Sequence, residues 1–257
     1  MEITKDLTIP KLFYAQAERF GKGRVAMREK EFGIWRPITW QDYLDNVKAI
    51  ALGLVRLGLK PGDKVSIIGV NRPEGLFAEM AVLCAGGVGV WLFQESLMEE
   101  VRYIIDHSDT KFFFGEGQEE VDKGLSILEA CPKLEKIIWD DPKGMRNYTL
   151  DTLMSLKEVR ELGRELDREQ PDLFKELVHQ GAGADTALLF YTSGTTSLPK
   201  GVLLTHYNML SMGKNLMTVD PCEPTDDYVS YLPFAWIGEQ MMSISCGLQI
   251  GYTLNFP

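Results

Sequence analysis

Between residues 39 and 140 the sequence alternates helical patterns with short apolar runs, and this alternation constrains the fold more than any other feature. The first helix is predicted to begin after Thr39, which is spaced from Asp42 as a capping pair, and to end near Gly58. The short runs are rich in β-branched residues, as in strands buried on both faces. Strands are predicted at 65–70, 88–93, 111–116 and 136–140, and helices at 75–85, 96–108 and 119–130. This order predicts an α/β fold of mostly parallel sheets with helices packed on their faces.

Composition limits the class of protein. The chain has 257 residues, of which 45% are hydrophobic, so it can bury one large core or two small ones. A formal net charge of -10 without a Lys/Arg cluster argues against a nucleic-acid partner. The four cysteines lack CxxC spacing, which favours a reducing compartment and predicts a cytoplasmic location. The most membrane-like window, residues 76–93, contains Glu79 and three glycines, and therefore predicts a buried helix, a turn and a buried strand.

A highly charged region precedes a second group of strands. Residues 141–180 contain a turn-rich stretch and a helical segment whose mixed charge predicts a solvated face. Strands are then predicted at 184–192 and 201–205, on either side of the loop YTSGTTSLPKG at residues 191–201. The expected arrangement is strand, loop, strand.

The loop has the composition of a phosphate-binding segment. It is longer than a chain reversal requires, and it ends in a cation at Lys200. Gly194 lets backbone N–H groups converge on an anion, and several neutral donors with one positive charge suit a phosphate chain. The alternative is an ordinary polar turn, because Ser, Thr, Gly and Pro are common turn residues. The loop does not match the Walker A pattern, since Gly201 follows Lys200 where that pattern needs Ser or Thr.

The same loop resembles the signature of the AMP-forming acyl-CoA synthetases and their adenylate-forming relatives, Y/F-T-S-G-S/T-T-G-x-P-K-G. Only Ser197 departs from it, at the usual glycine. The continuation LLTHYN also resembles the family, which implies a structural role for His206 rather than one as a general base. By this resemblance, ATP phosphates are bound by Thr192, Ser193, Gly194, Thr195, Thr196 and Lys200.

Two further stretches resemble the bacterial long-chain fatty-acid CoA ligases. The first runs from GQEEVDKGLSIL (117–128) through KIIWDDPKGMRNY (136–148). The second, SYLPFAWIGEQ (230–240), is similar to the acyl-tunnel motif L-P-L/F-A/S-H-x-x-E-R, with Trp236 at the usual histidine and Gln240 at the usual arginine. The resemblance implies a tunnel or gate role for Trp236, Gly238 and Glu239. The alternative for Trp236 is an ordinary core aromatic residue.

The resemblance implies the reaction of fatty acid, ATP and CoA to acyl-CoA, AMP and pyrophosphate through an acyl-adenylate, with Mg²⁺ accompanying ATP. Residues 1–257 are expected to be the first part of the large N-terminal AMP-binding domain, with the rest of that domain and the small C-terminal domain absent. The family's adenine, ribose, hinge and C-terminal lysine elements are not found, so no catalytic residue is assigned and this chain alone is expected to be inactive. Exposed apolar surface is expected around residues 228–257.

Two alternatives remain open at this stage. The chain could belong to an adenylate-forming ligase for another carboxylic acid, such as an aryl or medium-chain acid. It could also be a non-catalytic module that binds a nucleotide or an acyl chain. Metal ligands are not assigned, and both a homodimer and peripheral contact with a membrane are left as hypotheses.

Overall fold

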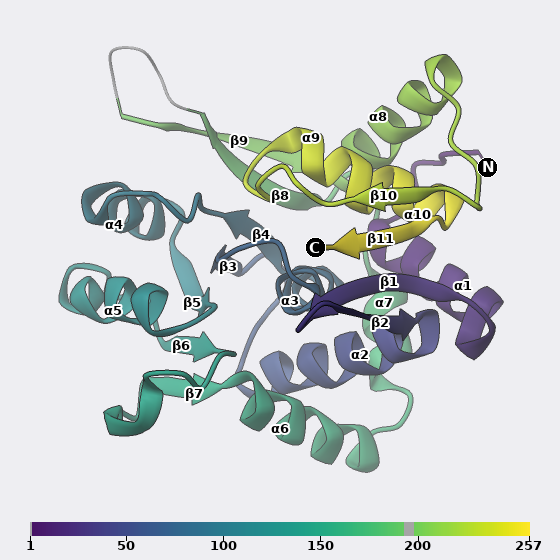
Figure 1. Cartoon of the computed structure of the whole chain (residues 1–257). Helices are drawn as coiled ribbons and strands as arrows, with labels where there is room; N and C mark the ends of the chain where they lie inside the picture. Colours follow the sequence, from purple (N-terminus) through teal and green to yellow (C-terminus); the bar gives the residue numbers. More distant parts are fainter. Residues whose placement is uncertain (1, 193–197) are drawn as a thin grey trace.

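The computed structural model describes residues 2–192 and 198–257, which form two sheets and the helices around them (Figure 1). The larger sheet has the strand order β7-β6-β5-β3-β4-β8-β9, and the smaller one has the order β10-β11-β1-β2. The helices are α1 Ile9–Phe20, α2 Trp40–Arg56, α3 Pro73–Cys84, α4 Met98–His107, α5 Gln118–Ser126, α6 Leu156–Glu169, α7 Leu173–Gln180, α8 His206–Val219, α9 Ile237–Glu239 and α10 Gly247–Ile250. The strands are β1 Val25–Glu31, β2 Ile34–Thr39, β3 Lys64–Ile68, β4 Val88–Trp91, β5 Thr110–Gly115, β6 Lys136–Trp139, β7 Leu153–Ser155, β8 Thr186–Thr192, β9 Lys200–Thr205, β10 Asp227–Val229 and β11 Thr253–Phe256.

The larger sheet confirms the predicted α/β fold. All its strands are parallel except β9, which pairs antiparallel with β8 at the edge. Helices α4 and α5 cover one face and share a core with apolar residues of the sheet, including Phe113 and Val90. Helices α2, α3 and α6 lie on the other face, in the core that also reaches the smaller sheet. Residues 76–93 form most of α3, a turn and β4, as predicted, and none of the described helices is long and apolar enough to cross a bilayer.

Helix α2 begins where the sequence predicts. The Thr39 hydroxyl accepts a hydrogen bond from the Asp42 N–H at 3.1 Å, and the Asp42 carboxylate accepts one from the Thr39 N–H at 2.9 Å. This reciprocal pair satisfies two N–H groups that the first helical turn leaves unbonded. The same hydrogen bonds lower the pKa of Asp42, so its carboxylate remains charged at the positive end of the helix dipole.

Helices α2 and α6 cross at two glycines. A Cβ built on Gly163 would lie 1.7 Å from the carbonyl oxygen of Ala49, and one on Gly53 would lie 2.1 Å from the carbonyl oxygen of Val159. Neither glycine can therefore be replaced without moving a backbone. The charged segment 156–169 does present a solvated face, but Leu156, Val159 and Leu166 on its other face are buried.

The smaller sheet joins segments that are distant in the sequence. Strand β1 pairs in parallel with β11, with Met27 opposite Leu254, and antiparallel with β2. Because β11 lies between β10 and β1, Leu254 and Phe256 are buried. The expected apolar surface around residues 228–257 is therefore wrong for the last part of the chain, whereas Tyr231 and Trp236 are indeed exposed.

A buried carboxylate connects α3, β4 and the π-helical segment Gln240–Cys246. Oε2 of Glu79 accepts hydrogen bonds from the Trp91 indole N–H at 2.8 Å and from the Gln240 amide at 3.0 Å. Its other oxygen has no partner among the described residues, and Glu79 is fully inaccessible to solvent. Burial raises the pKa of Glu79 to about 7, although the two hydrogen bonds oppose the shift.

The Gly163→Ala substitution is expected to destabilise the fold by about 1–3 kcal/mol, because α2 and α6 must separate to admit a methyl group. This cost exceeds the roughly 1 kcal/mol that alanine gains over glycine in a helix interior. Thermal denaturation should show a lower melting temperature. The matched control is Glu161→Ala on the exposed face of α6, which should melt close to the parent chain. A Gly163→Ala chain that melts at or above the parent temperature would contradict the crossing.

The Glu79→Gln substitution is expected to change how stability depends on pH. A carboxyl whose folded pKa is raised stabilises the fold fully below its unfolded value near 4.5, and this contribution is lost as pH rises through about 7. The loss is on the order of 2–3 kcal/mol between pH 5 and pH 8. Since glutamine does not titrate, the melting temperature of the variant should fall less than that of the parent chain between pH 5 and pH 8. An equal change in melting temperature for both chains between pH 5 and pH 8 would show that Glu79 does not titrate in the folded state.

Candidate functional site

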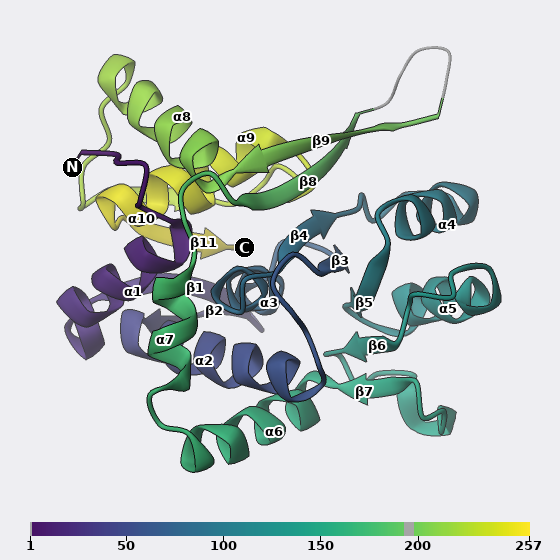
Figure 2. The same ribbon diagram turned by 180° about the vertical axis from the view of Figure 1, so that it is seen from behind.

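The β8–β9 hairpin positions both ends of the hydroxyl-rich loop. Thr192 ends β8 and Lys200 begins β9, and the two residues are directly opposite each other in the ladder. Both are exposed, and the hairpin extends beyond the neighbouring strands in both views (Figures 1 and 2). The predicted phosphate ligands Ser193, Gly194, Thr195 and Thr196 lie outside the described residues.

Helix α4 contacts both sides of the hairpin. The Tyr103 hydroxyl donates a hydrogen bond to the carbonyl oxygen of Pro199 at 3.0 Å. A second hydrogen bond of 2.8 Å joins Nδ1 of His107 to the Tyr191 hydroxyl. Partial burial raises the pKa of Tyr191 to about 12, so its phenol is neutral. Tyr103 and His107 were not predicted as site residues, because their only signal in the sequence is the i, i+4 spacing on the helix that precedes β5.

A groove of about 200 Å³ lies beside the carboxyl ends of β3 and β4. One wall is formed by residues that follow these strands, and the other by the segment 230–235. The Asn71 amide connects the walls, since it donates to the Ser230 hydroxyl at 2.7 Å and to the Leu232 carbonyl at 2.6 Å. The Trp91 ring lies between these walls and stacks on Phe234, with centroids 4.9 Å apart. Because ligands of open α/β sheets bind outside the carboxyl ends of strands, Asn71 could have been found from its place after β3.

The predicted gate residues lie next to this groove but do not line it. Trp236 is 51% exposed at the start of α9, and Gly238 lies near Leu232. Glu239 is fully buried. Their role as a tunnel wall or gate stays a prediction.

The buried carboxylate of Glu239 stabilises the segment 230–235 through hydrogen bonds. Its two carboxylate oxygens accept three short hydrogen bonds, which come from the hydroxyls of Tyr228 at 2.7 Å, Ser230 at 2.6 Å and Ser243 at 2.6 Å. Three hydroxyl donors can compensate for much of the cost of burying a carboxylate. The carboxylate therefore fixes the path of the chain that forms one wall of the groove.

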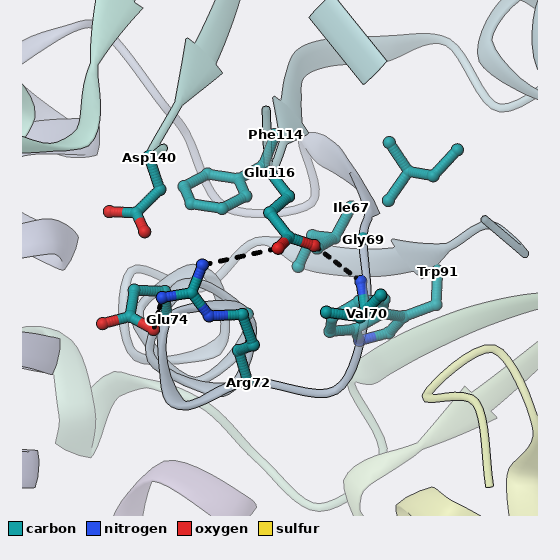
Figure 3. A pocket seen from close by; sticks show the side chains of 11 residues that line it. Ile67, Gly69, Val70, Arg72, Glu74, Trp91, Phe114, Glu116 and Asp140 are labelled. Atoms are coloured by element: carbon teal, nitrogen blue, oxygen red, sulfur yellow. Dashed lines mark hydrogen bonds and ion pairs between the residues drawn. The ribbon is translucent and has the colours of Figure 1, made fainter. Parts of the chain in front are cut away.

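Arg72 lies beside the groove, in a second pocket that shares Gly69, Val70 and Trp91 with it (Figure 3). Its guanidinium lies 3.1 Å from a Glu29 oxygen, 3.4 Å from a Glu116 oxygen and 3.7 Å from a Glu74 oxygen. Burial lowers the pKa of Arg72, but the carboxylates outweigh it and the net shift is upward. Burial raises the pKa of both Glu74 and Asp140. Since the arginine is already engaged by carboxylates, this cluster has a structural character and leaves only a cavity of about 10 Å³.

His206 lies at the opposite, amino-terminal end of β8, as the first residue of α8. It is 5% exposed, and its Nδ1 accepts a long hydrogen bond of 3.4 Å from the Ile9 N–H. Burial lowers the pKa of His206 to about 4, so the imidazole is neutral at physiological pH. This geometry supports the structural role expected for His206.

The implied Mg²⁺ has no ligand set among the residues that the structure describes. In residues 2–192 and 198–257, no group of three or more His, Cys, Asp or Glu side chains could hold a metal ion. The lysine at the end of the loop suits phosphate oxygens rather than a metal, because it is a cation and has no lone pair to donate.

Known proteins resemble both the sequence and the fold. The family described as AMP-binding enzyme matches residues 13–257. The long-chain-fatty-acid CoA ligase ACSBG2 of Rattus norvegicus is 31% identical over 255 residues, which cover 97% of this chain and 37% of the relative. The ligase ACSBG1 of the same species is 29% identical, with 97% and 34% covered. This chain thus spans about a third of the length of these curated relatives.

Solved structures with low identity share the fold. The long-chain-fatty-acid CoA ligase FadD1 of Archaeoglobus fulgidus superposes with a TM-score of 0.79 at 19% identity, over 99% of this chain and 47% of that one. The A domain of a carboxylic acid reductase from Segniliparus rugosus, solved with AMP and a co-purified carboxylic acid, has a TM-score of 0.73 at 17% identity, over 98% and 45%. These matches confirm the fold expected from the resemblance. Since the family match covers nearly the whole chain, including the signature loop, this chain belongs to the AMP-binding enzymes.

Proposed function

We propose that this chain binds the phosphates of ATP and a fatty acid in a long-chain fatty-acid CoA ligase. The observation that carries the proposal is that Thr192, at the carboxyl end of β8, and the groove after β3 and β4 lie at the same edge of parallel strands in one sheet. A nucleotide and a carboxylic acid bound at this edge would approach each other. The curated relatives named as long-chain-fatty-acid CoA ligases support the choice of acid.

In the proposed reaction, a carboxylate oxygen attacks the α-phosphorus of ATP. A new oxygen–phosphorus bond forms, and the bond to the bridging oxygen of pyrophosphate breaks. The thiol of CoA then attacks the acyl carbon and releases AMP. Thr192 and Lys200 flank the loop, so they would bind the β- and γ-phosphates and stabilise the leaving pyrophosphate. Mg²⁺ would neutralise further phosphate charge.

A second candidate is a ligase for a shorter or aromatic acid. The groove of about 200 Å³ is smaller than the roughly 300–1,000 Å³ of typical small-molecule pockets, which favours a compact substrate for the part described. The reductase domain solved with a carboxylic acid shows that this fold also occurs outside CoA ligases. A cytoplasmic location, membrane contact and a homodimer stay predictions, as does the inactivity of this chain alone.

The Lys200→Ala substitution is expected to weaken Mg-ATP binding by tenfold or more, since a hydrogen bond to a charged group contributes roughly 1.5–3 kcal/mol. Isothermal titration of the chain with Mg-ATP measures the dissociation constant. The control is Lys214→Ala, which removes an equally exposed lysine from α8 and should leave the affinity unchanged. Equal affinities for the parent and Lys200→Ala chains would disprove the role assigned to Lys200.

The Val70→Trp substitution is expected to block the groove. Val70 is 43% exposed and lines it, so an indole at this position would occupy the space proposed for the acid. Thermal shift with palmitate, octanoate and benzoate should show stabilisation of the parent by at least one acid and none of the variant. Val219→Trp, at the exposed end of α8, controls for the added indole. Retained stabilisation in Val70→Trp would place the acid elsewhere.

A further inference from the structure

Helix α4 is hydrogen-bonded to β8 and to the residue that precedes β9, on either side of the loop that the proposed function assigns to ATP. Tyr103 bonds to Pro199, the residue before Lys200, and His107 bonds to Tyr191, the residue before Thr192. Each of the two flanking phosphate ligands is thus one residue from an anchor point. We infer that Tyr103 and His107 are positioning residues that fix Lys200 and Thr192 for phosphate binding; this inference rests on the proposed function.

The two anchors form one unit. Tyr103 and His107 are four residues apart, so they lie one turn apart on the same face of α4. Their rings stack, with centroids 5.2 Å apart and an interplanar angle of 28°. The Tyr191 ring meets both of them edge-on, at 6.4 Å from Tyr103 and 5.7 Å from His107. Offset stacking and edge-to-face contacts are the favourable geometries for such rings, so movement of one ring disturbs the other two.

Helix α4 can serve as a support because its opposite side is in the core. Val101 is fully buried, and Ile104 and Ile105 are at most 6% exposed. These residues share a core cluster with Leu189 of β8. The helix is therefore held against the sheet independently of the two bonds to the hairpin.

The hairpin needs such a support because β9 is an edge strand. Among the described strands, β9 pairs with β8 alone, and the residues from Lys200 to Leu203 are exposed. Two-stranded ribbons without further packing are only marginally stable in water. The hydrogen bonds from α4 reach residues at or next to the last pairs of the ladder, Tyr191 with Gly201 and Thr192 with Lys200. Figure 2 shows this end of the hairpin extending beyond the neighbouring strands.

Neither anchor is assigned a contact with the reactants. Their effect on ATP therefore has to pass through the position of Lys200 and Thr192. If the anchors have a positioning role, removing one should both accelerate backbone amide exchange at the loop end of the hairpin and weaken nucleotide binding. If their role is purely structural, removing one should accelerate exchange or lower the melting temperature but leave the nucleotide affinity of the folded chain unchanged.

The test uses the chain with Tyr103→Phe, which removes one hydroxyl and keeps the ring, and with His107→Ala. Amide exchange at Tyr191 and Gly201, which pair in the ladder, and Mg-ATP affinity are measured for each. Loss of one neutral hydrogen bond should accelerate exchange and weaken Mg-ATP binding by about three- to tenfold. His107→Asn, which restores a hydrogen-bonding group near Nδ1, should recover part of both effects. The control is Asp106→Asn, an exposed change on the same helix, which should alter neither amide exchange nor Mg-ATP affinity.

The outcomes separate the inference from the proposed function. If Lys200→Ala weakens Mg-ATP binding but the α4 variants leave exchange or affinity unchanged, the positioning role is wrong and the phosphate role of the loop stands. If the parent chain does not bind Mg-ATP, or binds it no more tightly than Lys200→Ala does, the proposed function is wrong and the inference fails with it. Weaker binding and faster exchange in both α4 variants, with partial recovery in His107→Asn, support the positioning role.

Discussion

The parallel pairing of β3 with β4 on one side and β5 on the other determines where the candidate site is. Because these strands run in the same direction, the segments that leave them gather at one edge of the sheet. Asn71 follows β3 and Glu116 follows β5, while the hydroxyl-rich loop follows β8. The groove, the Arg72 cluster and the hairpin all depend on this common direction, although they include residues as far apart in the sequence as Glu29 and Ala235.

Much of the larger sheet could be predicted because its signals are local. The capping pair of Thr39 and Asp42 and the apolar runs of the strands each occupy a few neighbouring residues. The smaller sheet depends instead on a contact between Met27 and Leu254, for which no short pattern exists. The apolar residues at 252–256 were therefore expected at the surface, whereas the insertion of β11 beside β1 buries them.

The site was predictable to a similar, limited extent. The loop could be recognised because most of its predicted phosphate ligands are consecutive in the sequence, and the structure adds that Thr192 and Lys200 are directly opposite each other in the ladder. Contacts between distant segments had no such signal, as with Asn71 and Ser230 or His107 and Tyr191. The segment 230–240 illustrates the difference: its resemblance to the acyl-tunnel motif predicts an acyl site, but only the structure shows the Glu239 carboxylate buried against three hydroxyls.

The pairing of β1 with β11 also affects the order in which the molecule can assemble. The ribosome synthesises β1 and β2 before β11, which pairs with β1 and follows more than 200 residues later. During that interval one edge of β1 has free N–H and C=O groups that could pair with another nascent chain. The exposed Phe32 at the tip of the β1–β2 turn adds apolar surface to this intermediate. Late closure of the smaller sheet therefore leaves one edge of β1 unpaired until β11 has been synthesised.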